Sequence, residues 1–287
     1  MKKLLLLAVF FAFAFSAFCF DWPQKETESD SFYSYFGQLR GGTIGSSLIF
    51  KDNSDIKAAD KGKVVALIKE HDNDFGWFES TLGNTVILEH QNQMFTVYAN
   101  LDEDSVPEDI EEKQEVAKGC YLGQSGNSGW QEGQSCLEFK VFDTKNKTTI
   151  NPRVLMPRIG KELPLIMGGI TLEDKKNVTH YLQWERYLPS GNYLIYRDRQ
   201  ETAVPYKTVV SVNGAAVETI SYDTLKESDE RLCITGNTAY SKELIYPDSK
   251  RELLANIMLT HGRNTLTVTI IDILGSARSI TYNLDIY

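Results

Sequence analysis

The stretch Leu137–Phe142 (LEFKVF) alternates apolar and polar residues as far as Val141, and it follows a glycine-rich stretch, Lys118–Gly129 (KGCYLGQSGNSG). Strict alternation predicts a β-strand with one buried face, and closely spaced glycines predict tight turns. Two earlier stretches, Asn84–His90 and Met94–Ala99, have the same strand character and pair naturally across Gln91–Gln93. The first half of the chain is therefore predicted to consist of short β-strands separated by turns.

The second half also carries short strand patterns separated by turn residues. These strands are predicted at Gly191–Tyr196, Thr208–Val212, Asn264–Asp272 and Ser279–Leu284. Few helix signals accompany them, and those present are confined to Asp223–Asp229 and Ser241–Ile257. Short strands with regular turns predict a β-sandwich.

Three prolines and little periodicity mark residues 151–164 as the linker between the two halves. The fold class is therefore mainly β, with one domain at residues 32–157 and a β-sandwich domain at residues 165–287. A chain of 287 residues has the length expected for two domains.

The N-terminus has the pattern of a secretory signal peptide. Met1–Lys3 is positively charged, and the apolar run Leu4–Phe18 is shorter than the ~20 residues that a membrane-spanning helix needs. The signal peptide is predicted at residues 1–19, with cleavage before Phe20. Cys19 is an alternative site of lipidation, although the bulky Phe18 before it argues against this. The mature protein is expected in the periplasm or cell envelope, with no transmembrane segment.

The formal charge of −9, with acids and bases interspersed, gives no basic face and excludes nucleic acid as a partner. Cleavage of the signal leaves three cysteines, Cys120, Cys136 and Cys233. This odd number does not build a disulfide scaffold. Cys120 and Cys136 pair if their strands are neighbours; the alternative is that all three are small buried side chains.

Several blocks in the span Phe36–Pro157 resemble the M23 (LytM, lysostaphin-type) peptidase family. They occur in the family's order, at Gly83–His90, Thr96–Leu101, Lys118–Gly129 and Cys136–Val141. The resemblance implies a lysostaphin-type antiparallel β core with a groove. It also implies descent from zinc endopeptidases of the cell wall.

The resemblance places other residues where the family has its zinc ligands and catalytic histidines. Thr43 replaces the histidine and Ser47 the aspartate of the family's His-x-Gly-x-Asp motif. Cys136 and Glu138 replace the two histidines of His-x-His, and Asn100 replaces a further catalytic histidine. We call these five the vacated positions. Neutral hydroxyls are poor zinc ligands, so we expect no catalytic residues, no metal site and no cofactor. Zinc is expected only if the ligands are displaced elsewhere.

Cys136 and Asn100 also suggest a cysteine hydrolase, but that chemistry needs a histidine base beside the thiol. We therefore favour a buried cysteine and a hydrogen-bonding asparagine that fill a vacated site. His71 and His90 are interpreted as solvated loop residues.

Aromatic side chains near the groove are the candidates for binding. The family's groove is bordered by loops that correspond here to the surroundings of Trp77, Tyr98 and Trp130. Aromatic rings at a rim can stack on sugars or hold a peptide. For Tyr98, which lies within a strand pattern, we favour a core position.

The function expected from the resemblance to degenerate LytM-type proteins is non-catalytic. The protein would bind peptidoglycan or regulate a cell-wall hydrolase such as an amidase. One alternative is an active zinc endopeptidase with displaced ligands. Another is a structural or adhesion protein, since the C-terminal half resembles bacterial immunoglobulin-like modules and fold alone does not imply a reaction.

Overall fold

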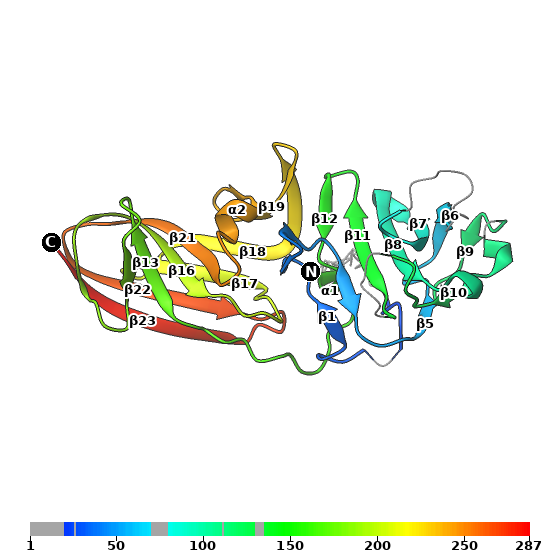
Figure 1. The fold of residues 1–287 in the computed structure, drawn as a ribbon, viewed down its shortest axis with the longest axis horizontal. Coiled ribbons are helices and arrows are strands. Elements are labelled where there is room, and N and C mark those ends of the chain that lie inside the picture. The colour runs from blue at the N-terminus through cyan, green and yellow to red at the C-terminus, as the bar shows by residue number, and fades with distance from the viewer. Residues whose placement is uncertain (1–19, 26, 70–79, 111, 130–134) are drawn as a thin grey trace, which may run out of the picture.

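The computed structural model describes residues 20–25, 27–69, 80–110, 112–129 and 135–287, and these residues are mainly β-structure (Figure 1). The mainly-β fold class is therefore confirmed. The predicted signal peptide lies outside the described residues. Within the described ranges, none of the helices has the length and apolar character needed to traverse a bilayer.

The first half is an antiparallel sheet with short accessory strands. Its strands are β1 (Phe32–Ser34), β2 (Leu39–Arg40), β3 (Thr43–Ile44), β4 (Leu48–Phe50), β5 (Asp55–Lys57), β6 (Gly62–Ile68), β7 (Asn84–Glu89), β8 (Met94–Leu101), β9 (Glu115–Val116), β10 (Tyr121–Gln124), β11 (Glu138–Asp143) and β12 (Thr148–Ile150). Three short 3-10 turns, η2 (Gln91–Gln93), η3 (Glu103–Ser105) and η4 (Glu108–Ile110), and helix α1 (Pro152–Leu155) complete it.

The strand β11, whose alternating sequence predicted it, lies at the centre of this half. It pairs with β8, with Phe139 opposite Tyr98, and also with β4, with Phe139 opposite Leu48. Phe139 and Tyr98 are fully buried with ring centroids 5.1 Å apart. Because successive side chains of a strand point to opposite faces, Glu138 and Lys140 lie on the face opposite to that of Phe139. The buried face of β11 therefore anchors the core, and its other face is left for the groove.

The second half is a two-layer sandwich, which is the predicted architecture. Its elements are β13 (Ile170–Asp174), β14 (Thr179–Tyr181), β15 (Tyr187–Leu188), β16 (Gly191–Asp198), β17 (Lys207–Val212), β18 (Ala215–Ser228), β19 (Arg231–Thr235), β20 (Ala239–Tyr240), α2 (Lys242–Ile245), β21 (Arg251–Leu259), β22 (Gly262–Ile271) and β23 (Ala277–Ile286). One layer is β14-β13-β16-β21, and the facing layer contains β23-β22-β17-β18. Residues from both layers, such as Ile195 and Val268, share one apolar core.

The two halves are joined by strand pairing, and Figure 1 shows β12 beside the hairpin that β18 forms with β19. The strand β12 pairs with β18, with Ile150 opposite Thr224, so that one sheet of 15 strands runs through the described residues. Two helical segments were expected from the sequence, and the helix expected at Asp223–Asp229 is wrong. Its residues up to Ser228 form the end of β18, because that end is held between β12 and β19. The other segment holds only α2, one short helix, before β21 begins.

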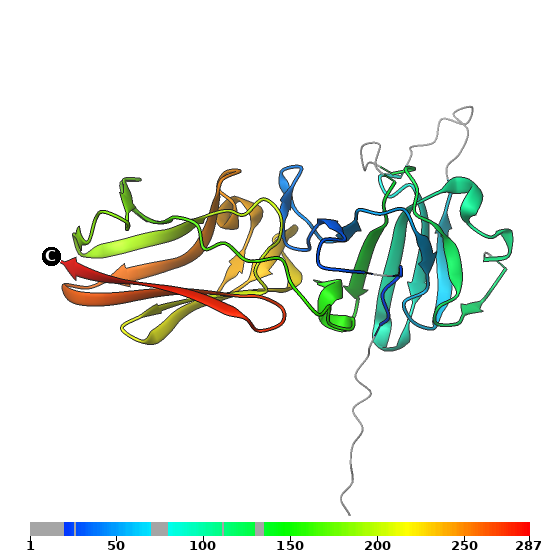
Figure 2. The same ribbon diagram turned by 90° about the horizontal axis from the view of Figure 1, so that it is seen from below.

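The hairpin β2–β3 reaches from the first half onto the second. Phe36, which precedes the hairpin, and Ile44, its last residue, belong to an apolar cluster whose other buried members come from the second half. The Tyr246 hydroxyl donates a hydrogen bond of 2.7 Å to the Gly37 carbonyl. Figure 2 shows this blue segment between the two halves. The wall of the groove that carries Thr43 is therefore supported by the C-terminal half.

The three described cysteines are free thiols. Pairing of Cys120 with Cys136 is therefore not found. Cys120 precedes β10, which pairs with β5, whereas Cys136 precedes β11. Cys136 and Cys233 are buried and Cys120 is half-buried, which agrees with the alternative interpretation for two of the three.

Candidate functional site

A cavity of about 340 Å³ lies at the groove where the sequence places the vacated site. Three of the five vacated positions, Thr43, Ser47 and Glu138, line it together. The complete lining among the described residues is Ser34, Arg40, Thr43, Ile44, Gly45, Ser46, Ser47, Ile49, Thr81, Leu82, Glu138 and Lys140. We call it the groove cavity. Its walls come from the β2–β3 hairpin, the edges of β1 and β4, the loop before β7, and β11.

The carboxylate of Glu138 is neutralised from within the site. Its side chain is 3% exposed, and Lys140 Nζ lies 2.9 Å from Glu138 Oε1. An unpaired buried charge would be costly, and the ion pair with Lys140 offsets part of that cost. Lys140 was not among the site residues expected from sequence. The sequence did contain a signal for it: Lys140 lies two residues after Glu138 on the predicted strand, and side chains two residues apart lie on the same face.

Asn100 and Cys136 form a separate, closed cluster beside the groove cavity. Asn100 Nδ2 donates to the carbonyls of Gly126 and Cys136, at 2.7 Å each, and lies 3.5 Å from Cys136 Sγ. Asn100 Oδ1 accepts from the Gly129 N–H at 2.7 Å. Asn100 is fully buried and Cys136 is 2% exposed. The amide therefore ties the glycine-rich loop to β11, as the preferred sequence interpretation predicted.

Gly126 is the glycine of that loop whose small size is required. A Cβ placed on it would lie 2.3 Å from the backbone nitrogen of Asp102, a distance that no side chain tolerates. The close approach lets the Gly126 carbonyl reach the Asn100 amide. The glycine-rich stretch thus serves packing at the closed cluster.

Cys136 lacks the surroundings of a nucleophile. Burial raises the pKa of its thiol above the ordinary value, more than the Asn100 hydrogen bond and the charge of Arg40 lower it. The thiolate is the reactive form, so the neutral thiol dominates at physiological pH. Within the described residues no histidine is hydrogen-bonded to it. The geometry therefore does not support cysteine hydrolysis.

Among the residues that the structure describes, those lining the groove cavity do not fit a catalytic zinc ion. Such an ion needs three ligands of the His, Asp, Glu or Cys type. Among the described residues, no group of three such side chains is placed to hold a metal. Glu138 is paired with Lys140, and Thr43 and Ser47 offer neutral hydroxyls.

The aromatic candidates give one correction. Tyr98 is fully buried, and its hydroxyl accepts a 2.7 Å hydrogen bond from the Ala59 N–H. It is therefore a core residue, as its strand pattern favoured, and its inclusion among the binding candidates is wrong. Trp77 and Trp130 lie outside the described residues.

The interpretation of His90 as a solvated loop residue is also wrong. His90 is 6% exposed, with Nδ1 2.8 Å from the Lys61 carbonyl and Nε2 2.7 Å from Thr96 Oγ1. Burial lowers its pKa, so the neutral ring is favoured. Both ring nitrogens are occupied by structural hydrogen bonds. His71 lies outside the described residues.

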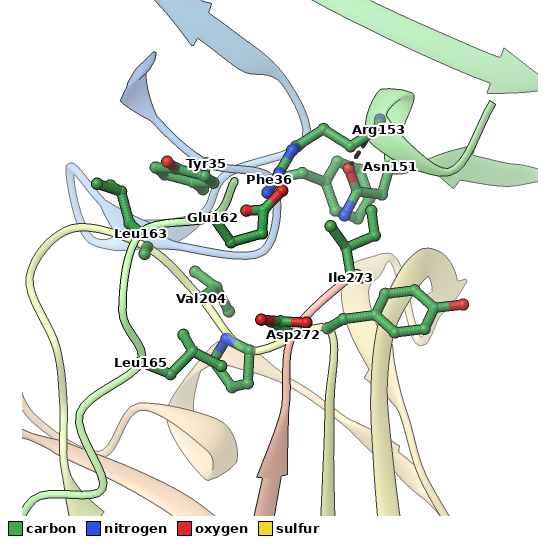
Figure 3. Close-up of a pocket in the computed structure, with 13 residues that line it drawn as sticks. Tyr35, Phe36, Asn151, Arg153, Glu162, Leu163, Leu165, Val204, Asp272 and Ile273 are labelled. Atoms are coloured by element: carbon green, nitrogen blue, oxygen red, sulfur yellow. Dashed lines mark hydrogen bonds and ion pairs between the residues drawn. The ribbon is translucent and has the colours of Figure 1, made fainter. Parts of the chain in front are cut away.

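A second cavity, shown in Figure 3, lies at the junction of the two halves. Its volume is about 20 Å³, which is room for about one water molecule. Arg153 and Glu162 form an ion pair on its wall, and Asn151, Val204 and Asp272 also line it. Its size makes it a feature of the junction rather than a site for a ligand.

The first half is thus an antiparallel β core with a groove cavity, which is the architecture that the resemblance to the M23 family implied. Comparison with known families agrees with this. The model of peptidase family M23 matches residues 43–152, and the match begins at Thr43, the first vacated position. A second family model matches residues 164–287. An uncharacterized protein of Treponema pallidum (strain Nichols) is 32% identical over 119 residues, which cover 38% of this chain and 78% of that protein. Residues 43–152 of the chain are therefore a peptidase family M23 domain.

Proposed function

We propose that this chain is a non-catalytic M23 protein of the cell envelope, which binds peptidoglycan through the groove cavity. Membership of a cell-wall peptidase family supports a peptidoglycan-related role. The proposal that the protein is non-catalytic rests on the residues that stand at the positions of the family's zinc ligands. Glu138 is held by Lys140, and Thr43 and Ser47 line the same cavity with hydroxyls.

The persistence of the cavity supports binding. A site that had lost its chemistry and all other use could fill with side chains, because protein interiors pack closely. Here about 340 Å³ remains open, within the size range of pockets for small ligands. The groove is also braced by the C-terminal half through Phe36 and Ile44, which keeps its wall in place.

Sedimentation with purified sacculi tests the proposal. We expect the mature protein to sediment with sacculi and to release no peptides from them. Elemental analysis of the same preparation should give much less than one zinc per chain. One zinc per chain together with peptide release would contradict the proposal and identify a working endopeptidase. Absence of sedimentation would contradict peptidoglycan binding.

A blocking variant locates the binding surface. Thr43 is exposed at the cavity mouth, so Thr43→Trp should obstruct the cavity without disturbing the core and should reduce sedimentation. Thr260→Trp places the same ring on an exposed position of the C-terminal half and is the matched control. Equal sedimentation of both variants would place peptidoglycan binding elsewhere on the protein.

A further inference from the structure

We propose that a pocket between linker residues 160–165 and the turn that joins β22 to β23 binds an amphipathic organic anion, a carboxylate with a short apolar chain. We call it the linker pocket. Its volume is about 320 Å³, within the range of pockets that hold small ligands. The described residues that line it are Gly160, Lys161, Glu162, Leu163, Pro164, Leu165, Ile270, Asp272, Leu274, Ser276 and Arg278. None of them is in the described lining of the groove cavity, so the inference does not depend on peptidoglycan binding there.

Both walls of the linker pocket are held in place by hydrogen bonds. On the linker side, the Gln200 side chain accepts from the Ile166 N–H at 3.0 Å and donates to the Pro164 carbonyl at 3.2 Å. On the hairpin side, Asp272 Oδ1 accepts from the backbone N–H groups two and four residues further along, at 2.9 and 2.8 Å. The pocket therefore has a fixed wall on each side.

Much of the wall is apolar. Leu163 and Leu165 line the pocket from the linker, and Figure 3 shows them on one stretch of it. Ile270 and Leu274 line it from the hairpin. Ile270 is fully buried, whereas Leu274 is 41% exposed. Removing apolar surface from water is favourable, so a ligand with an apolar chain gains free energy by covering these side chains.

The two acidic side chains of the described lining already have partners. Glu162 forms a buried ion pair with Arg153, whose guanidinium lies over the Tyr35 ring at 5.3 Å from its centroid. Asp272 accepts from the two backbone N–H groups of its own turn. A cationic ligand would have to compete with these partners for either carboxylate.

The two basic side chains of the described lining, Lys161 and Arg278, are exposed. Arg278 lies directly opposite Ile270 on the neighbouring strand, and residues paired in this way lie on the same face of a sheet. Arg278 is therefore on the face of the hairpin that carries the buried Ile270. Within the part of the chain that the structure describes, neither basic side chain forms a hydrogen bond or an ion pair. A carboxylate at the pocket rim can therefore bind an ammonium group and a guanidinium fork while its chain covers the apolar wall.

Titration of the full mature chain, followed by backbone amide NMR, tests the inference. The probes are N-acetyl-leucine, sodium hexanoate, the neutral amide of each, and sodium acetate. We expect saturable shifts at Leu163, Leu274 and Ser276 with at least one of the two larger acids. Its amide should bind at least about ten-fold more weakly because the charge-assisted hydrogen bonds are lost, and acetate should do so because it has no apolar chain to bury.

The two larger acids distinguish the sources of this chemistry. Tighter binding of N-acetyl-leucine would identify the C-terminal end of a peptide, and tighter binding of hexanoate would identify an aliphatic acid. Equal binding of an acid and its amide, acetate binding as tight as that of the larger acids, or no shifts with any probe would overturn the inference.

Variants assign the binding to the named side chains. Arg278→Gln should weaken binding of the larger acids by about ten-fold, whereas Arg263→Gln, the same change at a 95% exposed side chain of the same hairpin, should not affect it. Leu274→Ala should weaken it by about five-fold, and Leu244→Ala, at a 53% exposed leucine of α2, is its control. Unchanged binding in both Arg278→Gln and Leu274→Ala would overturn the assignment.

A variant of the groove cavity separates the two sites. Thr43→Trp obstructs the groove cavity and should leave binding of the larger acids unchanged, because Thr43 is not in the described lining of the linker pocket. Loss of acid binding in Thr43→Trp would place the acid in the groove cavity and overturn the inference.

Discussion

Asn100 determines the shape of the closed cluster, because its single amide satisfies three backbone groups. It also has a positive φ of 63°, a conformation that asparagine tolerates better than most residues. We expect Asn100→Ala to lower the free energy of unfolding by about 3 kcal/mol or more, since buried backbone groups lose their partners at about 1–3 kcal/mol each. The midpoint of urea unfolding measures this.

Asn92 provides the matched control for Asn100. It has a nearly identical φ of 59° but is exposed in the turn η2. Asn92→Ala therefore measures the cost of placing alanine at a positive φ, and it should lower the free energy of unfolding much less than Asn100→Ala does. Similar midpoints for the two variants would show that the Asn100 hydrogen bonds add little to stability.

Cys136 should resist alkylation because burial raises its thiol pKa above the ordinary value of 9.0. At pH 8 we expect iodoacetamide to modify the half-buried Cys120 first, as peptide mass mapping would show. The pKa of the Cys136 thiol is higher in the folded protein than in the unfolded chain. The protonated thiol therefore makes its full contribution to folding stability at pH values below the pKa of the unfolded chain. It is lost as the pH rises through the folded pKa. Modification of Cys136 as fast as Cys120 would show that its thiol is accessible.

At the scale of elements, the segment that carries the β2–β3 hairpin is held against the C-terminal half by hydrogen bonds from Tyr246 to Gly37 and from Gln38 to the Glu201 carbonyl. Gly37 has a φ of 81°, and a Cβ on it would lie 2.9 Å from Tyr222 Cδ1, so the hairpin approaches the C-terminal half very closely. Tyr246→Phe removes the donor to the Gly37 carbonyl and should cost about 1 kcal/mol. We expect faster hydrogen exchange at amides 37–45, measured by mass spectrometry. Tyr187→Phe, at an exposed tyrosine, is the control, and equal exchange in both variants would contradict the role of the Tyr246 contact.

The same elements show how far the sequence predicts the fold and the site. Alternation of apolar and polar residues predicted β11, and closely spaced glycines predicted the turns before it, because both signals are local in the sequence. It could not predict that β12 pairs with β18, since strand pairing between distant segments depends on tertiary context. Local propensity therefore suggested helix at Asp223–Asp229, where β18 continues. The ligand replacements were readable from residue identity, whereas Arg40 and Ser34 reach the groove cavity only through the fold.

For the whole molecule, the shared sheet and the cluster around Phe36 predict that the two halves unfold together. Phe36 is 1% exposed and packs among residues of the C-terminal half, including Ile220 and Leu253. Phe36→Ala should cost about 3–5 kcal/mol and should reduce hydrogen-exchange protection in β18 and β21 as well as in the first half. Phe139→Ala deletes an equally buried ring from the core of the first half. It should affect β6–β8 first and reach β21 only if the whole chain is one cooperative unit. Unchanged protection of β18 and β21 in Phe36→Ala would mean that the halves are independent and that the C-terminal half does not brace the groove.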